Sequence, residues 1–236
     1  MSLQFRVSER PRRHDLVFVT PKSWRAVLST RKTLATDPLI APWVDNGWPL
    51  IGRRAMPADR QAVPLGLPLP PGASRRRLSM VVQPEDIVSI AAPPALDTVC
   101  QGAPRSWQWT LDRLDALAAR YSIDVRVCGS LAWSALTGLD YLTDRSDLDV
   151  LLYVNRDTDV CHLTSAIAGI EEAAPMRLDG ELIRDDGAAV SWREFHHGTR
   201  EILVKTVAGV ALIDPTLFLS GNPDPFTGAD APSPER

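Results

Sequence analysis

Two aspartates separated by one residue are the first side chains in this sequence whose spacing indicates chemistry. Asp147 and Asp149 stand at the start of the apolar run SDLDVLLYV, which is typical of a buried strand. Because side chains alternate between the two faces of a strand, we expect both carboxylates on one face. Two neighbouring carboxylates repel each other unless a cation lies between them, and Mg²⁺ commonly takes one or two carboxylates together with phosphate oxygens. The pair therefore predicts a magnesium site.

A glycine and a serine stand where the preceding strand is expected to end. Gly129 and Ser130 close the alternating run IDVRVCGS and lead into LAWSALTGL, which we expect to form a short helix that ends at Gly138. A glycine lets the backbone approach a phosphate closely, and a helix N-terminus presents N–H groups to an anion. Either pair alone is also common at ordinary strand ends. Together they predict metal-assisted phosphoryl or nucleotidyl transfer.

A third carboxylate is available in the segment MRLDGELIR. Asp179 and Glu181 lie two residues apart, so they share one face of the expected strand. We prefer Asp179 as the third acid and keep Glu181 as the alternative. A salt bridge at a hairpin edge would explain both residues without a catalytic role.

Three basic residues are candidates for contacts to the phosphates of a substrate. Arg54 ends the segment IGRR, and Arg76 is the middle of three consecutive arginines, which could equally form a solvated face. Lys205 is the only charge in the apolar segment LVKTV, where it could neutralise a leaving pyrophosphate or simply extend to the solvent. His14 and Trp133 are expected to be packing residues, not catalytic ones.

Composition is that of a globular protein without a membrane span. The chain has 236 residues, of which 44% are hydrophobic and 23% charged. No apolar run approaches the roughly 20 residues that a spanning helix needs, and the first residues do not resemble a secretory signal. We therefore expect a cytoplasmic protein with no membrane partner. The odd number of cysteines and the absence of a CxxC spacing predict reduced thiols and no structural zinc: Cys100, Cys128 and Cys161.

Charge is distributed unevenly along the chain. Residues 1–95 carry 14 basic against 7 acidic side chains, and residues 96–236 carry 12 against 22. This asymmetry suits an anionic ligand held between a basic wall and an acidic, cation-holding wall, although two oppositely charged solvated surfaces would show it too. The acidic second half argues against a nucleic-acid partner, whose phosphates favour a basic surface.

The same division predicts the domain organisation. Eleven prolines between Pro38 and Pro94 favour short strands and turns over helices. We expect a basic, proline-rich N-terminal domain (1–95), a linker near 91–103, a catalytic domain (104–220) and a disordered, turn-rich tail (221–236).

Individual elements follow from hydrophobic periodicity. A strand followed by a helix is expected in 14–28. Strands are expected at 49–55 and 76–83 in the proline-rich part. In the second half we expect a helix at 106–121 with Ser106 as its N-cap, further helices at 131–139 and 161–174, and strands at 123–130, 146–154, 176–184 and 189–195. Within 201–214 we expect a strand, a glycine turn and a second strand.

The order of strand, Gly-Ser, short helix and strand opening with Asp-x-Asp resembles the nucleotidyltransferase superfamily of the polymerase-β type. The resemblance implies an α+β fold, with a small β-rich N-terminal domain and a C-terminal nucleotidyltransferase domain built on a mixed sheet.

Longer segments resemble a narrower family, malonate decarboxylase holo-[acyl-carrier-protein] synthase. They are RHDLVFV (13–19), PWVDNGWPLIGRR (42–54), GLPLP (66–70), residues 127–152, LDGELI (178–183), AVSWREF (189–195) and LVKTVAGVAL (203–212).

This second resemblance implies a phosphoribosyl-dephospho-CoA transferase. Such an enzyme takes 2′-(5″-triphosphoribosyl)-3′-dephospho-CoA, attaches the phosphoribosyl-dephospho-CoA part to a serine of the apo acyl carrier subunit of malonate decarboxylase, and releases pyrophosphate. It also implies two Mg²⁺ ions about 4 Å apart, held by Asp147, Asp149 and Asp179. Gly129 and Ser130 would contact the β- and γ-phosphates, and Arg54, Arg76 and Lys205 the remaining anionic groups.

Two other functions compete with this one. The first is a nucleotidyltransferase that uses ordinary ATP or CTP on a protein or small-molecule acceptor. The second is a non-catalytic scaffold whose carboxylates have lost their role, against which the presence of all three acids argues.

Overall fold

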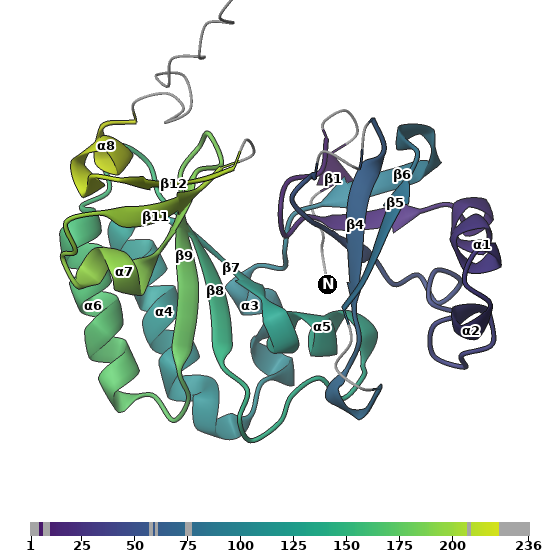
Figure 1. Cartoon of the computed structure of the whole chain (residues 1–236). Helices are drawn as coiled ribbons and strands as arrows, with labels where there is room; N and C mark the ends of the chain where they lie inside the picture. The colour runs from purple at the N-terminus through teal and green to yellow at the C-terminus, as the bar shows by residue number, and fades with distance from the viewer. Residues whose placement is uncertain are drawn as a thin grey trace, which may run out of the picture. The chain divides into compact units, whose positions relative to one another are not determined.

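The computed structural model describes residues 5–6, 10–56, 59, 61–73, 77–206 and 209–221. Its contacts divide the chain into two compact units, each made of two segments. Unit 1 is Met1–Gln108 with Arg126–Asp149, and unit 2 is Trp109–Val125 with Val150–Arg236. The predicted tail lies, after Gly221, outside the described residues. Helices and strands are labelled in Figure 1.

The sheet of unit 1 has six strands in the order β1-β6-β2-β3-β4-β5. Every pairing in it is antiparallel. The strands expected in the proline-rich part are present but shorter than predicted. The six strands are β1 (Phe5–Arg6), β2 (Leu16–Val19), β3 (Leu50–Gly52), β4 (Val63–Pro68), β5 (Arg77–Val82) and β6 (Ile87–Ala91).

The first helix of unit 1 begins as its sequence predicts. The Thr20 side chain accepts a hydrogen bond from Ser23 N at 3.1 Å, and Pro21 occupies the first turn, where its missing N–H costs little. This first helix is α1 (Pro21–Ser29). The other α-helices of unit 1 are α2 (Lys32–Ala35), α3 (Leu96–Val99) and α5 (Gly129–Thr137). The expected linker therefore contains a helix, α3, which the 3₁₀ turn Cys100–Gly102 continues.

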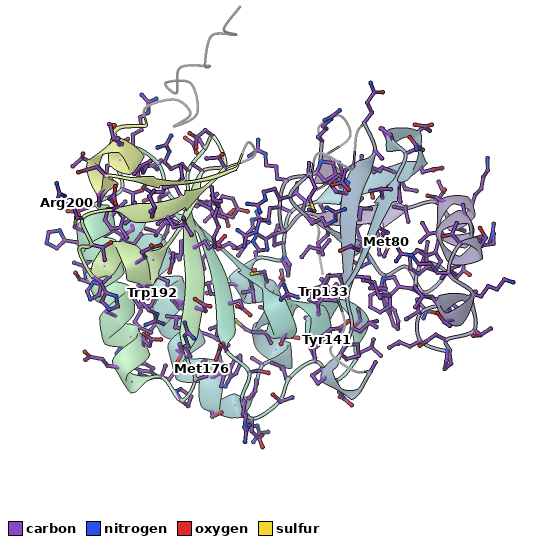
Figure 2. The ribbon with its side chains drawn as sticks, viewed as in Figure 1. Met80, Trp133, Tyr141, Met176, Trp192 and Arg200 are labelled. Carbon is purple, nitrogen blue, oxygen red and sulfur yellow. The ribbon has the colours of Figure 1, made fainter. Side chains whose placement is uncertain are left out.

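The core of unit 1 joins its sheet to the segment from Trp133 to Tyr141. Trp43, fully buried, packs near Trp133, with ring centroids 6.2 Å apart, and Trp133 in turn lies 6.1 Å from Tyr141. Figure 2 labels both Trp133 and Tyr141. The Tyr141 hydroxyl donates to Pro68 O at 2.8 Å, and burial raises the pKa of this phenol. Trp133, at 4% exposure, is thus the core residue that we expected.

The second sheet has the order β12-β11-β10-β9-β8-β7. Strands β9 to β12 pair antiparallel, and β11 and β12 form a hairpin (Figure 1). The α+β class with two sheets is confirmed. The six strands are β7 (Asp124–Cys128), β8 (Leu148–Tyr153), β9 (Leu178–Ile183), β10 (Ala189–Ser191), β11 (Ile202–Lys205) and β12 (Val210–Ile213).

The remaining helices are α4 (Gln108–Tyr121), α6 (Val160–Ala173), α7 (Trp192–His196) and α8 (Pro215–Ser220). Helix α4 begins two residues after the predicted N-cap, because Arg105–Trp107 forms a 3₁₀ turn. Helix α8 was not predicted, although Pro215 in its first turn and the Asp214 side chain, which accepts from Thr216 N, are ordinary start signals.

One predicted strand is partly wrong. The segment AVSWREF is a strand only to Ser191, and Trp192–His196 forms helix α7. Trp192 and Phe195, three residues apart, are 1% and 7% exposed, which is helical spacing, and the Trp192 indole donates to Leu178 O at 3.1 Å. Burial of both aromatic rings against the unit 2 core therefore overrides the alternating pattern.

No helix in the described part of the chain is long and apolar enough to cross a membrane. All three cysteines are among the described residues, and none of them is in a disulfide.

Candidate active site

Helix α5 begins at Gly129 in a conformation that favours glycine. Cys128, the N-cap, is extended, and Gly129 has φ +64°. At the other end Gly138, with φ +72°, donates its N–H to Ser134 O at 2.8 Å and ends the helix. The predicted strand, Gly-Ser start and glycine stop are confirmed.

The carboxylate of Asp149 lies against Gly129, and both residues belong to unit 1. A β-carbon added at Gly129 would come within 1.8 Å of Asp149 Oδ2 and 2.6 Å of Asp149 Cγ. Glycine at this position therefore leaves the space that the carboxylate occupies beside the first turn of α5. Ser130, the next residue, is half-buried.

The two aspartates follow the alternation expected of a strand. Asp147 and Asp149 are half-buried, whereas Leu148 and Val150 are fully buried. The carboxylates therefore lie on the face opposite the buried pair, Asp147 just before β8 and Asp149 as its second residue.

Their donor set suits Mg²⁺, which prefers oxygen ligands and often keeps only one or two carboxylates. Glycine at position 129 gives the Asp149 carboxylate its place beside a helix start, where phosphate groups bind well. Within the described ranges no group of three or more His, Cys, Asp or Glu side chains is arranged as a metal site. Asp147 and Asp149 thus fit a metal whose other ligands come from a substrate or water.

Two candidates of unit 2 form an ion pair: the salt bridge considered for Glu181 is present, with Lys205 as the partner that the sequence did not indicate. Lys205 Nζ lies 2.7 Å from Glu181 Oε1, with the two side chains 36% and 11% exposed. The register pairs Lys205 with Ala189 and Ala189 with Ile183, so Lys205 and Glu181 share a face of the sheet. The sequence signal for this ion pair was weak: one lysine in the apolar segment LVKTV and one glutamate in the segment LDGELI.

Asp179, the preferred third acid, is half-buried on β9. Its Oδ1 accepts a hydrogen bond from Gly180 N at 3.0 Å. Of the two candidate acids, Glu181 therefore forms an ion pair with Lys205, whereas Asp179 accepts a backbone hydrogen bond.

The predicted arginines have different surroundings. Arg54 is exposed, while its neighbour Arg53 makes two hydrogen bonds to Asp59, at 2.9 and 2.7 Å. These bonds hold the pKa of Asp59 below its usual value. Arg76 lies outside the described residues, and Arg77, the first residue of β5, is exposed.

A pocket of about 320 Å³ lies within unit 2, lined by residues of 154–161, 184–186 and 218–221. None of the predicted site residues lines this pocket. The candidate site therefore does not coincide with this pocket.

Two family models match consecutive parts of the chain. Residues 12–93 match the family model described as phosphoribosyl-dephospho-CoA transferase MdcG N-terminal domain, and residues 95–216 match the corresponding C-terminal domain. No solved structure matches the chain.

Curated relatives carry the name phosphoribosyl-dephospho-CoA transferase. One from Bradyrhizobium diazoefficiens is 54% identical over 211 residues, which cover 89% of this chain and 93% of the relative. One from Xanthomonas campestris pv. campestris is 33% identical over 205 residues, covering 86% and 94%. One from Azotobacter vinelandii is 29% identical over 169 residues, covering 71% and 73%.

The fold and these matches define a two-domain transferase of the α+β class. The chain belongs to the phosphoribosyl-dephospho-CoA transferase MdcG family. The family resemblance inferred from the sequence is therefore confirmed, and so is the activity of a phosphoribosyl-dephospho-CoA transferase.

Proposed function

We propose that this protein transfers the phosphoribosyl-dephospho-CoA group from 2′-(5″-triphosphoribosyl)-3′-dephospho-CoA to a serine of the apo acyl carrier subunit of malonate decarboxylase, with release of pyrophosphate. The acceptor follows from the family that the sequence segments resemble. The observation that carries the proposal is the position of the Asp149 carboxylate against Gly129 at the start of α5. It puts a carboxylate beside backbone N–H groups suited to phosphate oxygens.

The reaction makes one bond and breaks one. The carrier serine Oγ forms a bond to the α-phosphorus, the bond from that phosphorus to the bridging oxygen of the β-phosphate breaks, and the serine proton passes to solvent water as pyrophosphate leaves. Catalysis of this kind depends mainly on positioning and on neutralising charge. Bound Mg²⁺ would supply the neutralising charge on the phosphates.

Each candidate residue has a distinct part in this scheme. Asp147 and Asp149 hold the metal, and the amides at Gly129 and Ser130 bind the β- and γ-phosphates. Asp179 orients the serine hydroxyl or completes the metal site.

Three basic residues complete the proposal. Arg54 and Arg76 contact the anionic groups of the dephospho-CoA part. Lys205 neutralises the leaving pyrophosphate, and its contact with Glu181 would hold the ammonium group in place.

The C-terminal family domain adopts, in this proposal, the polymerase-β type of nucleotidyltransferase fold. The order β7, Gly-Ser, α5 and β8 with its Asp-x-Asp pair supports this. Binding of Mn²⁺, a paramagnetic substitute for Mg²⁺, measures the metal site at this aspartate pair. We expect Asp149→Asn to lose this binding.

The experiment that tests the function measures the intact mass of the apo carrier subunit after incubation with this protein, Mg²⁺ and the triphosphoribosyl substrate. We expect a mass gain equal to the phosphoribosyl-dephospho-CoA group, absent when the carrier serine is replaced by alanine. A parallel reaction contains ATP instead. Adenylylation in the ATP reaction alone, or no modification in either with folded protein and competent carrier, would overturn the proposal.

A further inference from the structure

A short loop of unit 1 is tightly held against the end of β3. Gly52 N donates to Asp15 O at 2.7 Å, and His14 N donates to Gly52 O at 3.1 Å. Within the loop Arg12 N donates to Asp15 Oδ2 at 2.8 Å, and the Asp15 residue is only 3% exposed. The segment from Arg12 to Asp15 is therefore a built feature of the fold.

The loop also adopts backbone geometry that other residues would resist. His14 has φ +75°, a left-handed conformation that non-glycine residues adopt at a cost. A β-carbon at Gly52 would come within 2.2 Å of Arg12 O, so only glycine allows the loop to lie this close. Strain of this kind is retained where the surrounding structure imposes it, commonly at binding sites.

The result is a concentration of arginines at one end of the sheet. Arg12 and Arg13 are exposed in the loop, and Arg53 and Arg54 directly follow the glycine that contacts it. Arg53 is paired with Asp59, whereas Arg54 is exposed. Guanidinium groups bind phosphate in a bidentate manner, so the exposed arginines of such a cluster suit an anionic ligand.

Consecutive pairings within unit 1 connect this loop to the segment that begins α5. Leu16, next to the loop, pairs with Ala91 at the end of β6. The chain then runs to Pro94, whose carbonyl accepts from Val127 N at 2.9 Å, and Gly129 follows two residues later. Leu16, which follows the arginine loop, and Val127, which precedes the candidate phosphate-binding turn, thus pair with the two ends of one stretch of chain, 91–94.

We propose that Arg12 and Arg13, presented by this loop beside Arg54, bind phosphate groups of the substrate. The proposal rests on the proposed function, because it assigns a subsite to the same small-molecule substrate. The ligand chemistry is a polyphosphate, and the substrate carries two such groups: the triphosphate that reacts and the pyrophosphate of the dephospho-CoA part.

Calorimetric titration of the full-length protein tests this with two probes, tripolyphosphate and 3′-dephospho-CoA. The double variant Arg12→Ala/Arg13→Ala is expected to weaken binding of one probe by roughly 10- to 100-fold, the loss typical of charge-assisted hydrogen bonds. The affected probe identifies the phosphates that bind here. Arg25→Ala, which removes an exposed arginine of α1 in the same unit, is the matched control and should change neither affinity.

Steady-state kinetics give an independent readout. We expect the double variant to raise KM for the triphosphoribosyl substrate while kcat stays within about threefold, and Arg12→Lys/Arg13→Lys to restore part of the affinity. Unchanged binding of both probes would overturn the proposal, as would a raised KM for the carrier protein alone, which would make the loop a protein contact. If the wild-type protein does not modify the carrier but the double variant still binds one probe more weakly than the wild type, the proposed acceptor fails and the arginine site stands.

Discussion

The carboxylate of Asp149 lies so close to the Cα of Gly129 that a side chain at position 129 would overlap it. The added β-carbon would be 1.8 Å from Oδ2 and 2.6 Å from Cγ, and the residue also has φ +64°. Two independent constraints thus favour glycine at position 129: the positive φ of the backbone and the space that the Asp149 carboxylate occupies. Since the same glycine starts α5, the acid and the phosphate-binding turn depend on each other for their positions.

We predict that Gly129→Ala loses most of the transferase activity. The methyl group must displace the Asp149 carboxylate or shift the first turn of α5, and misplacement of reacting groups by about 1 Å can cost roughly 100-fold in rate. The measurement is the initial rate of carrier modification by intact mass, with thermal unfolding as the check on folding.

The matched control for this change is Gly138→Ala at the other end of α5. Gly138 has φ +72°, yet nothing lies within 4 Å of an added β-carbon. It should cost about 1–2 kcal/mol of stability, the usual penalty for a left-handed alanine, and leave the rate nearly unchanged below the unfolding temperature. Equal losses of rate in both variants would show that backbone strain alone, without the Asp149 contact, explains the effect.

We predict that Asp147→Asn and Asp149→Asn each abolish transfer and leave the fold intact. Each removes one negative charge from a half-buried pair, so metal binding weakens while little packing is lost. The rate should fall by at least about 100-fold, measured at several Mg²⁺ concentrations. Asp144→Asn, an exposed acid in the preceding loop, is the control and should behave as the wild type. Normal turnover by either Asp147→Asn or Asp149→Asn would contradict the metal assignment.

Local signals made the strand, helix and strand around the candidate site predictable. Polar and apolar residues alternate in IDVRV, and Gly129 and Gly138 stand at the two ends of the short helix. The run after Asp149 is continuously apolar, so each segment specifies its own structure. The same logic failed at residues 192–195, which we expected to continue the strand that begins at Ala189. Helix α7 forms there because burial of Trp192 and Phe195 is decided by tertiary packing, which a local pattern does not contain.

Charge pairs were the less predictable part of the site. Asp147 and Asp149 are close in sequence, so strand geometry alone places them on one face. Glu181 and Lys205 are 24 residues apart, and only the registers of β9, β10 and β11 bring them together. A pairing of this kind depends on strand order, which the sequence of each strand does not encode.

The Glu181–Lys205 pair predicts unequal effects of removing its two members. Lys205→Met leaves a carboxylate with 11% exposure without its ammonium partner, and should cost roughly 2–4 kcal/mol of unfolding free energy. Glu181→Gln leaves Lys205, 36% exposed, able to reach water, and should cost about 1 kcal/mol. Urea unfolding measures both. The double variant should be more stable than Lys205→Met alone; a Glu181→Gln variant that is as unstable as Lys205→Met would contradict this account of the pair.

A second ion pair in unit 2 predicts how stability responds to acid. Glu171 Oε1 accepts from Arg193 Nη2 at 2.6 Å and from Leu178 N at 3.0 Å, which ties α6 to α7 and β9. The hydrogen bond from Arg193 is the main reason that the pKa of Glu171 lies below its ordinary value of 4.5. The ionised form is therefore the one that stabilises the fold.

Because the folded-state pKa of Glu171 is lowered, its contribution is fully present above pH 4.5, the unfolded value, and disappears as the pH falls through the folded value. Glu171→Gln should therefore cost about 1–3 kcal/mol at pH 7, and its deficit relative to the wild type should shrink once the pH drops below about 4. Urea unfolding between pH 3 and 7 measures this, with Glu172→Gln, an exposed neighbour on the same helix, as the control. A deficit that stays constant across this range would mean that Glu171 acts by shape and not by charge.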